Sequence, residues 1–213
     1  MQYSFNFSAM TFDALPPFHS IGHLVFDVET TGLPKNWKPP VSDLQNWPRI
    51  IQMGWLIYDS NSALIHSEAH IIKPNGFTIP GDSVAVHGIS QQQAQDEGIE
   101  GKLVFDRFSG LLKQTDTVIA HNLNFDQTVL QAEFLRYNIK DTFKHPQKIC
   151  TKVSGTDICK LPGKYGYKWP SLAELSQHLF GESFQEKHEA LYDATAAANC
   201  YFEMKKQGVL LKD

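Results

Sequence analysis

Residues 21–32 decide the fold, and they read Ile21-Gly22-His23-Leu24-Val25-Phe26-Asp27-Val28-Glu29-Thr30-Thr31-Gly32. The apolar run at 21–26 predicts a strand buried on both faces, which is typical of a central strand in an α/β sheet. Side chains alternate along a strand, so Asp27 and Glu29 are expected on the same face. Two neighbouring acids repel each other and resist desolvation, so their pairing indicates a cation between them. The alternative is an ordinary strand end with two solvated acids.

A second motif combines a strand end with a helix start, Val118-Ile119-Ala120-His121-Asn122-Leu123-Asn124-Phe125-Asp126. Asn122 is predicted to cap the helix, and Asp126 lies four residues later in its first turn. Taken alone, Asp126 is equally consistent with an acid that the helix dipole favours. This motif therefore indicates a functional site only in combination with the other motifs of the chain.

A third motif lies near the C-terminus, where Lys187-His188-Glu189-Ala190-Leu191-Tyr192-Asp193-Ala194 leads into an alanine-rich helix. At 100° per residue, His188 and Asp193 would lie about 140° apart on one helix and would share no face. They converge only if His188 stands in the loop before the helix and Asp193 in an early turn. A solvated loop histidine is the alternative.

In this order, the patterns D-x-E, N-x3-D and H-x4-D resemble the DnaQ-like 3′–5′ exonucleases with four acids and a histidine. That group includes the proofreading epsilon subunit of bacterial DNA polymerase III, oligoribonuclease and RNase T. The matching residues are Asp27, Glu29, Asp126, Asp193 and His188. The sister group needs a tyrosine four residues before the last acid, where this chain has Glu189. Stretches 48–58 and 86–89 also match, so the resemblance covers roughly residues 20–206.

The resemblance implies the α/β ribonuclease H-like fold, a mixed five-stranded sheet flanked by helices, with the second strand antiparallel. It implies two Mg²⁺ ions, replaceable by Mn²⁺, on the four carboxylates. Asp27 would bridge both ions, Glu29 and Asp193 would hold the first, and Asp126 would act on the second through water. His188 would take a proton from the attacking water. The expected substrate contacts are Thr30, Thr31, Leu33, Asp82, His87 and Asn122.

The expected substrate is the single-stranded or frayed 3′ end of DNA, in a role like proofreading or repair, with nucleoside 5′-monophosphates as products. RNA is the alternative, because no motif reports recognition of the 2′-OH. A catalytically silent nucleic-acid-binding module would have lost an acid or the histidine, and all five are present. Association with a polymerase stays open, because the epsilon subunit carries a polymerase-binding tail after its nuclease domain and this chain ends soon after its last predicted helix.

With 213 residues and 42% hydrophobic content, the chain suits one exonuclease domain at 20–213 after an N-terminal extension at 1–19. The sequence contains no apolar run of membrane-spanning length and no secretory signal. Its three cysteines are odd in number and lack C-x-x-C spacing, which is typical of reduced thiols. We therefore expect a cytoplasmic protein without membrane association.

The net charge of −4 is unevenly distributed. Segment 136–168 holds eight basic and two acidic residues, a net charge of +6, so the rest of the chain has a net charge of −10. A basic segment on an acidic body predicts contact with a phosphate backbone, and a solvated lysine-rich loop is the alternative.

The proline-rich segment 34–48 is interpreted as an insertion that either lines the substrate groove by stacking on a base or packs as a surface loop.

The hydrophobic pattern predicts strands at 21–28, 50–58, 63–73, 117–121 and 147–151. A polar turn at 59–62 should join the second and third strands as a hairpin. Ser171 and Glu174 should form a capping box. Helices are predicted at 82–86, 90–97, 101–114, 123–137, 171–179 and 189–206.

Overall fold

The structure of the protein is a computed structural model that describes residues 21–182, 187–209 and 211–212, and the predicted extension at 1–19 lies outside these described ranges. The strands are β1 (Ile21–Thr30), β2 (Ile50–Tyr58), β3 (Leu64–Ile71), β4 (Thr115–Ala120), β5 (Gln147–Cys150), β6 (Pro162–Gly163) and β7 (Gly166–Tyr167). The helices are α1 (Gly81–His87), α2 (Gln91–Glu97), α3 (Gly101–Leu112), α4 (Leu123–Arg136), α5 (Thr151–Cys159), α6 (Leu172–Phe180) and α7 (Ala190–Lys206).

The main sheet has five strands in the order β3-β2-β1-β4-β5. The pairs β1–β2 and β2–β3 are antiparallel, while β1–β4 and β4–β5 are parallel. This confirms the predicted mixed sheet with an antiparallel second strand and a hairpin across 59–62. β1 lies at the centre because its apolar run can be buried only where both faces are covered.

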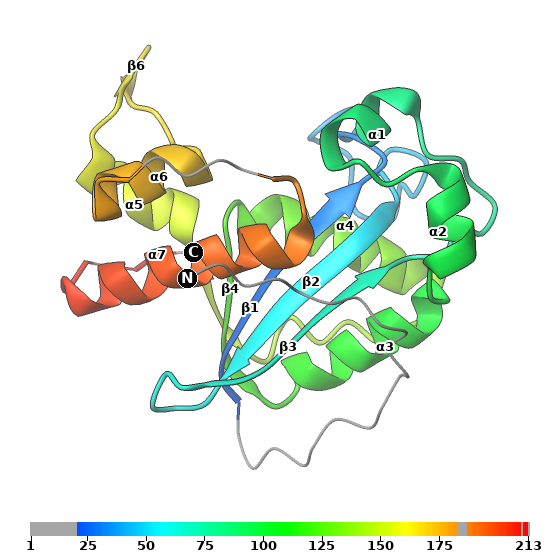
Figure 1. Ribbon diagram of the computed structural model, residues 1–213, viewed down its shortest axis with the longest axis horizontal. Coiled ribbons are helices and arrows are strands. Elements are labelled where there is room, and N and C mark those ends of the chain that lie inside the picture. The colour runs from blue at the N-terminus through cyan, green and yellow to red at the C-terminus, as the bar shows by residue number, and fades with distance from the viewer. Residues whose placement is uncertain (1–20, 183–186, 210, 213) are drawn as a thin grey trace.

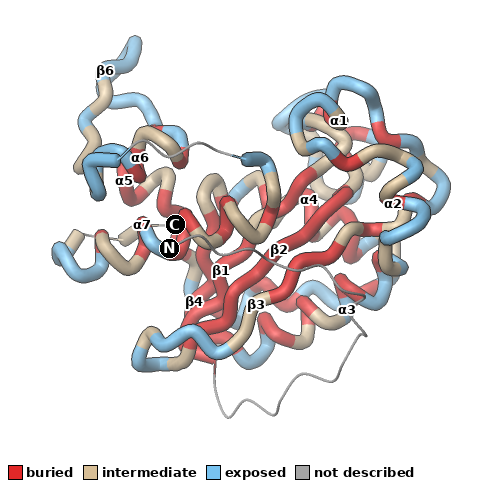
Figure 2. Tube along the Cα trace, viewed as in Figure 1, coloured by how far each residue is buried: buried red, intermediate tan, exposed pale blue. Residues whose placement is uncertain are grey.

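Helices cover both faces of the sheet, and the buried strands lie between them (Figures 1 and 2). On one face, Phe26 of β1 packs in a cluster with Phe108 of α3 and Phe134 of α4. On the other face, Val25 packs against the alanine-rich side of α7. Because side chains alternate along β1, Asp27 and Glu29 lie on the same side as Val25, toward α7.

Two elements were not predicted, α5 and the small β6–β7 hairpin. The α5 sequence, Thr-Lys-Val-Ser-Gly-Thr-Asp-Ile-Cys, is rich in residues of low helix propensity, so its helicity depends on packing. Gly155 shows how close that packing is, because a Cβ at this position would lie 2.7 Å from a methyl carbon of Leu175 in α6. The helix is therefore stabilised by a neighbour that follows later in the chain.

The predicted N-terminal cap is confirmed at one helix, α6, and is wrong at another, α4. Ser171 and Glu174 form the predicted capping box at the start of α6. The predicted side-chain cap by Asn122 on α4 is wrong. Asn122 adopts a left-handed backbone conformation (φ 81°) and makes no side-chain cap bond. Its Oδ1 instead accepts a hydrogen bond from Lys152 Nζ at 3.1 Å.

Segment 34–48 packs against the body of the protein. Trp47 is buried and donates a hydrogen bond from Nε1 to the carbonyl of Pro40 at 3.1 Å. Trp37 is 56% exposed, and its ring centroid lies 5.9 Å from that of Phe125. Only Trp37 of the two tryptophans is therefore available to a ligand.

The three cysteines are free thiols, as predicted. In the part of the chain that the structure describes, no helix is both long enough and apolar enough to cross a membrane.

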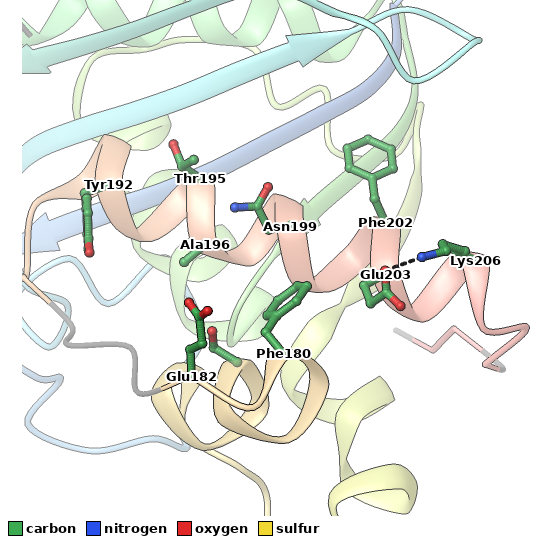
Figure 3. Close-up of a pocket in the computed structure, with 10 residues that line it drawn as sticks. Phe180, Glu182, Tyr192, Thr195, Ala196, Asn199, Phe202, Glu203 and Lys206 are labelled. Carbon is green, nitrogen blue, oxygen red and sulfur yellow. Dashed lines mark hydrogen bonds and ion pairs between the residues drawn. The ribbon is translucent and has the colours of Figure 1, made fainter. Parts of the chain in front are cut away.

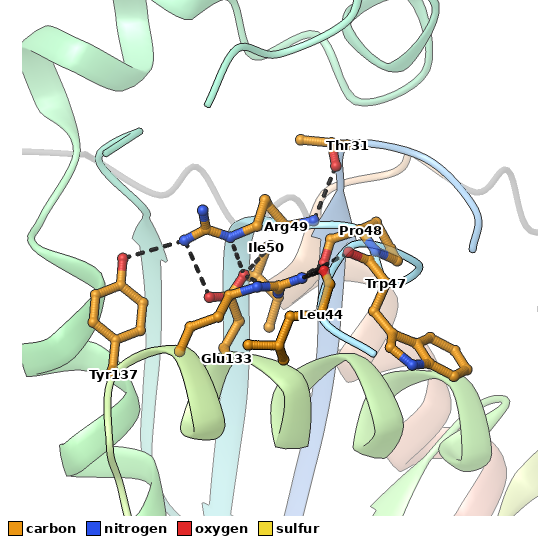
Figure 4. A network of polar contacts seen from close by, with 9 residues as sticks. Thr31, Leu44, Trp47, Pro48, Arg49, Ile50, Glu133 and Tyr137 are labelled. Atoms are coloured by element: carbon orange, nitrogen blue, oxygen red, sulfur yellow. Dashed lines mark hydrogen bonds and ion pairs between the residues drawn. The ribbon is translucent and has the colours of Figure 1, made fainter. Parts of the chain in front are cut away.

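Glu133 of α4 is completely buried and organises a network of charged groups (Figure 4). Its carboxylate accepts hydrogen bonds from Arg49 Nε at 2.8 Å and from Arg136 at 3.1 Å. It also accepts one from the backbone N–H of Ile50 at 3.1 Å. Arg136 donates to the backbone carbonyls of Leu44, Trp47 and Pro48. Arg136 therefore stabilises segment 34–48, which corrects its assignment to a surface that binds phosphates.

Replacing Glu133 should destabilise the protein strongly, because Glu133→Ala leaves two guanidinium groups without their shared buried partner. We expect the free energy of unfolding to fall by about 3–5 kcal/mol, measured by urea denaturation. Asp106→Ala is the matched control, since Asp106 pairs with Lys102 on an exposed helix face. Its loss should be at most about 1 kcal/mol. Equal losses in the two variants would contradict the role given to Glu133.

Candidate active site

One hollow of about 530 Å³ collects the predicted acids and the histidine. It lies where the ends of β1 and β4 meet the first turns of α4 and α7, which is where parallel strands present their carboxyl ends. The predicted acids and the histidine that line it are Asp27, Glu29, Asp126, His188 and Asp193. These residues are separated by up to 166 positions in the sequence and meet only through the fold.

A glycine on β2 allows α7 to approach the sheet. Gly54 pairs with Asp27 across the β1–β2 ladder. A Cβ at position 54 would lie 2.4 Å from the backbone nitrogen of Leu191, so any larger residue would push the start of α7 away. Because α7 lies this close, Asp193 in its first turn reaches the acids of β1.

The loop before α7 is held by two sets of hydrogen bonds. The carboxylate of Glu189 caps the helix by accepting from the backbone N–H groups of Leu191 and Tyr192. The backbone N–H of Ala190 donates to Gln52 Oε1 at 2.9 Å. His188 lies just outside the helix, exposed and in a left-handed conformation (φ 50°). This is the placement that the H-x4-D spacing requires for convergence.

Glu29, His188 and Asp193 approach one another most closely. One potential ligand atom from each lies within 4.8 Å of those of the other two. Glu29 and Asp193 are buried, whereas His188 faces solvent. The group therefore combines two desolvated carboxylates with an imidazole that water can reach.

The electrostatics of the site favour a bound cation. Burial, together with the charges of Asp193, Asp126 and Glu189, raises the pKa of Glu29 to about 8. Burial also raises the pKa of Asp126, although backbone N–H groups, including that of Val28, oppose this. The donor set consists of carboxylate oxygens, which suit a hard divalent cation. The residues present therefore fit a metal site.

The six predicted substrate contacts fall into two groups. Leu33, which is 74% exposed, and Asn122 line the hollow, whereas Thr30, Thr31, Asp82 and His87 are not among its lining residues. The two threonines support the turn after β1: Thr30 Oγ1 donates to the carbonyl of Gly32, and Thr31 Oγ1 accepts from the N–H of Arg49.

His87 lies close to His188, although it does not line the hollow. Burial lowers the pKa of His87, and the charge of His188 lowers it further. Its Nδ1 accepts a hydrogen bond from the N–H of Ile89 at 3.1 Å. His87 is therefore held by the loop after α1, beside the exposed histidine.

Sequence reasoning did not single out Phe125 and Trp169, which also line the hollow. His121 and Lys152 line it as well. Lys152 Nζ lies 5.0 Å from the ring centroid of Trp169. Burial and the charge of Lys152 lower the pKa of His121 to about 4, so its ring is neutral near pH 7. The basic composition of segment 136–168 indicated Lys152, but α5, which carries it, was not predicted.

A larger groove of about 680 Å³ lies between α6 and α7 (Figure 3). Phe180 and Phe202 line it, and Glu203 forms an ion pair with Lys206 at 3.2 Å. The described residues that line it include none of the predicted site residues. The smaller hollow is therefore the candidate active site, because it contains the buried acids and the larger groove does not.

Comparison with known proteins agrees with this geometry. The RNase T family model, described as Exonuclease, matches residues 24–201. No curated protein matches the chain. Among solved structures, the zinc-bound form of an E. coli exonuclease I complex with single-stranded DNA is 20% identical, with a TM-score of 0.67 over 89% of this chain and 41% of that chain. Exonuclease I from Methylocaldum szegediense is 18% identical, with a TM-score of 0.68 over 87% of this chain and 40% of that chain.

These structural matches confirm the predicted ribonuclease H-like fold. A third match, E. coli exonuclease I in complex with a dT13 oligonucleotide, is 20% identical, with a TM-score of 0.67 over 86% of this chain and 40% of that chain. The chain spans about two fifths of the length of the exonuclease I chains that it matches.

Proposed function

The chain belongs to the exonuclease family, and from that premise we propose that it removes nucleoside 5′-monophosphates from the 3′ end of single-stranded or frayed DNA, with divalent metal ions. The observation that carries the proposal is the convergence of four carboxylates and His188 in one hollow. Residues 20–213 would act as one exonuclease domain.

The carboxylates of Asp27, Glu29, Asp126 and Asp193 would hold two Mg²⁺ ions, and Mn²⁺ would substitute. The chemistry that such a pair of ions supplies is stabilisation of negative charge on the attacking and leaving oxygens of a phosphodiester. The raised pKa of Glu29 supports this assignment, because a cation would relieve the crowding of buried negative charge.

His188 is the proposed general base. It is exposed to water and lies beside Glu29 and Asp193, so it can accept a proton from the attacking water. An imidazole suits this role because it exchanges its proton near neutral pH. His87 lies near it, and Leu33 and Asn122 would contact the terminal nucleotide at the edge of the hollow.

A single strand of DNA is the proposed substrate for two reasons. Lys152 and Lys168 line the hollow and can attract its phosphates. The solved structures of similar fold include E. coli exonuclease I complexes with dT13 and dA16 oligonucleotides. Proteins distinguish RNA from DNA by contacts to the 2′-OH of the sugar, so the choice of DNA as the substrate needs a direct test.

The test offers 5′-labelled single-stranded DNA, duplex DNA with a mispaired 3′ end, and RNA of the same sequence to the purified protein. With Mg²⁺ or Mn²⁺, the label should move through progressively shorter DNA products, and chelation with EDTA should stop the reaction. A circular single strand is the control and should stay intact. Cleavage of the circle, shortening from the 5′ end or full activity in EDTA would contradict the proposal. If RNA were cleaved faster than DNA, the proposed substrate would be RNA and not DNA.

A further inference from the structure

The β6–β7 hairpin carries an unusual density of exposed aromatic and basic side chains. Residues 160–169, here called the aromatic hairpin, read Lys160-Leu161-Pro162-Gly163-Lys164-Tyr165-Gly166-Tyr167-Lys168-Trp169. Tyr165 is 91% exposed, Tyr167 55% and Trp169 62%. The hairpin projects beyond α5 and α6 at one end of the molecule, and most of it is exposed (Figures 1 and 2).

These rings contribute little to the stability of the fold. Each strand of the hairpin has only two residues, and so short a hairpin is marginally stable without support. The rings of Tyr165 and Tyr167 lie largely in water, so little of their apolar surface is buried to stabilise the fold. Their exposure therefore indicates a surface that binds a ligand with flat faces.

The basic groups of the hairpin lie beside its rings. Lys164 Nζ lies 5.1 Å from the ring centroid of Tyr165. Lys168 Nζ forms an ion pair with Glu174 at 2.5 Å, at the foot of the hairpin. Aromatic faces next to positive charges match the two parts of a single-stranded nucleic acid, its bases and its phosphates.

The foot of the hairpin is part of the acid-lined hollow. Lys168 and Trp169 line that hollow together with Asp27 and Glu29. Trp169 follows Tyr167 by two residues, just after the end of β7. Exposed aromatic and basic residues therefore extend along the chain from Lys168 and Trp169 at the hollow to Tyr165 near the tip of the hairpin.

We propose that the aromatic hairpin binds the single strand that leads to the acid-lined hollow, with Tyr165 and Tyr167 stacking on bases and Lys164 contacting phosphate. This inference rests on the proposed function and extends it, because it assigns the nucleotides before the cleaved end to a particular surface. Stacking on an aromatic ring is tolerant of sequence, so the hairpin would retain any strand without selecting bases.

The test compares a double variant, Tyr165→Ala with Tyr167→Ala, with the wild-type protein. We expect its affinity for 5′-fluorescein-labelled dT15, measured by anisotropy in EDTA, to fall roughly 5- to 150-fold for each stacked base that is lost. The matched control, Tyr165→Phe with Tyr167→Phe, keeps both rings and should keep the wild-type affinity. Lys164→Ala should make the slope of log affinity against log salt shallower by about 0.7.

A dinucleotide, dT2, separates this inference from the proposed function, since the inference assigns to the hairpin only the nucleotides that precede the cleaved end and dT2 lacks them. The double variant should cut dT2 with Mg²⁺ at the wild-type rate while it cuts dT15 more slowly at limiting concentration. If the wild-type protein shortens neither dT15 nor dT2, the proposed function is wrong. If it cuts both, and the double variant binds and cuts dT15 as the wild type does, the hairpin inference is wrong.

Discussion

Replacing Asp126 by Asn should abolish cleavage, lowering turnover by at least about 10³-fold. The substitution preserves the size of the side chain and its ability to accept the N–H of Val28, but it removes a buried negative charge from the proposed metal site. Turnover of labelled single-stranded DNA should be measured at saturating Mg²⁺ beside Asp126→Ala. Wild-type turnover in either variant would contradict the assignment of four acidic ligands.

The same variant should keep or raise the stability of the metal-free protein. Burial raises the pKa of Glu29 to about 8 and also raises that of Asp126, so the folded state binds these protons more tightly than the unfolded state does. The resulting stability is complete below the ordinary carboxyl pKa of about 4 and is lost as pH rises toward 8.

Thermal denaturation in EDTA should therefore show the wild-type protein losing stability between about pH 4 and pH 8, with a smaller loss in Asp126→Asn. Added Mg²⁺ should restore stability to the wild type and much less to the variant. If the variant were markedly less stable than the wild type in EDTA at pH 8, the carboxylates would not be under the repulsion that the geometry indicates.

Replacing His188 by Ala should lower turnover by about 10²–10⁴-fold while the binding of metal and of the strand persists. His188 is exposed and outside α7, so its removal should leave the fold unchanged. The wild-type rate should rise with pH below neutrality, as expected for a reaction that needs a general base, and this rise should vanish in the variant. His178→Ala, at an exposed position of α6, is the matched control and should behave as the wild type.

If His188→Ala cut as fast as the wild type with the same dependence on pH, a different base would be needed. His87 would then be the next candidate, because it lies near His188. His121 also lines the hollow, but its lowered pKa of about 4 makes it a weak proton acceptor near neutral pH.

The sequence by itself determined the order of the main elements and the identity of the acids that converge. The apolar run before Asp27 predicted a central strand, and β1 is central. The alternation along that strand placed Asp27 and Glu29 on one face, and both line the hollow. These features could be predicted because burial, alternation and capping depend on residues close together in the chain.

Tertiary structure alone decided which distant residues meet, both around those acids and in the network of Glu133. Arg136 was counted as a surface charge, but it is held by Glu133 and by carbonyls of segment 34–48. Lys152 reaches the hollow because α5, a poor helix former by sequence, packs against α6. The start of α7 reaches β1 because Gly54 lacks a side chain and Gln52 binds the N–H of Ala190, 138 residues away. Such contacts join distant parts of the chain, and no local pattern reports them.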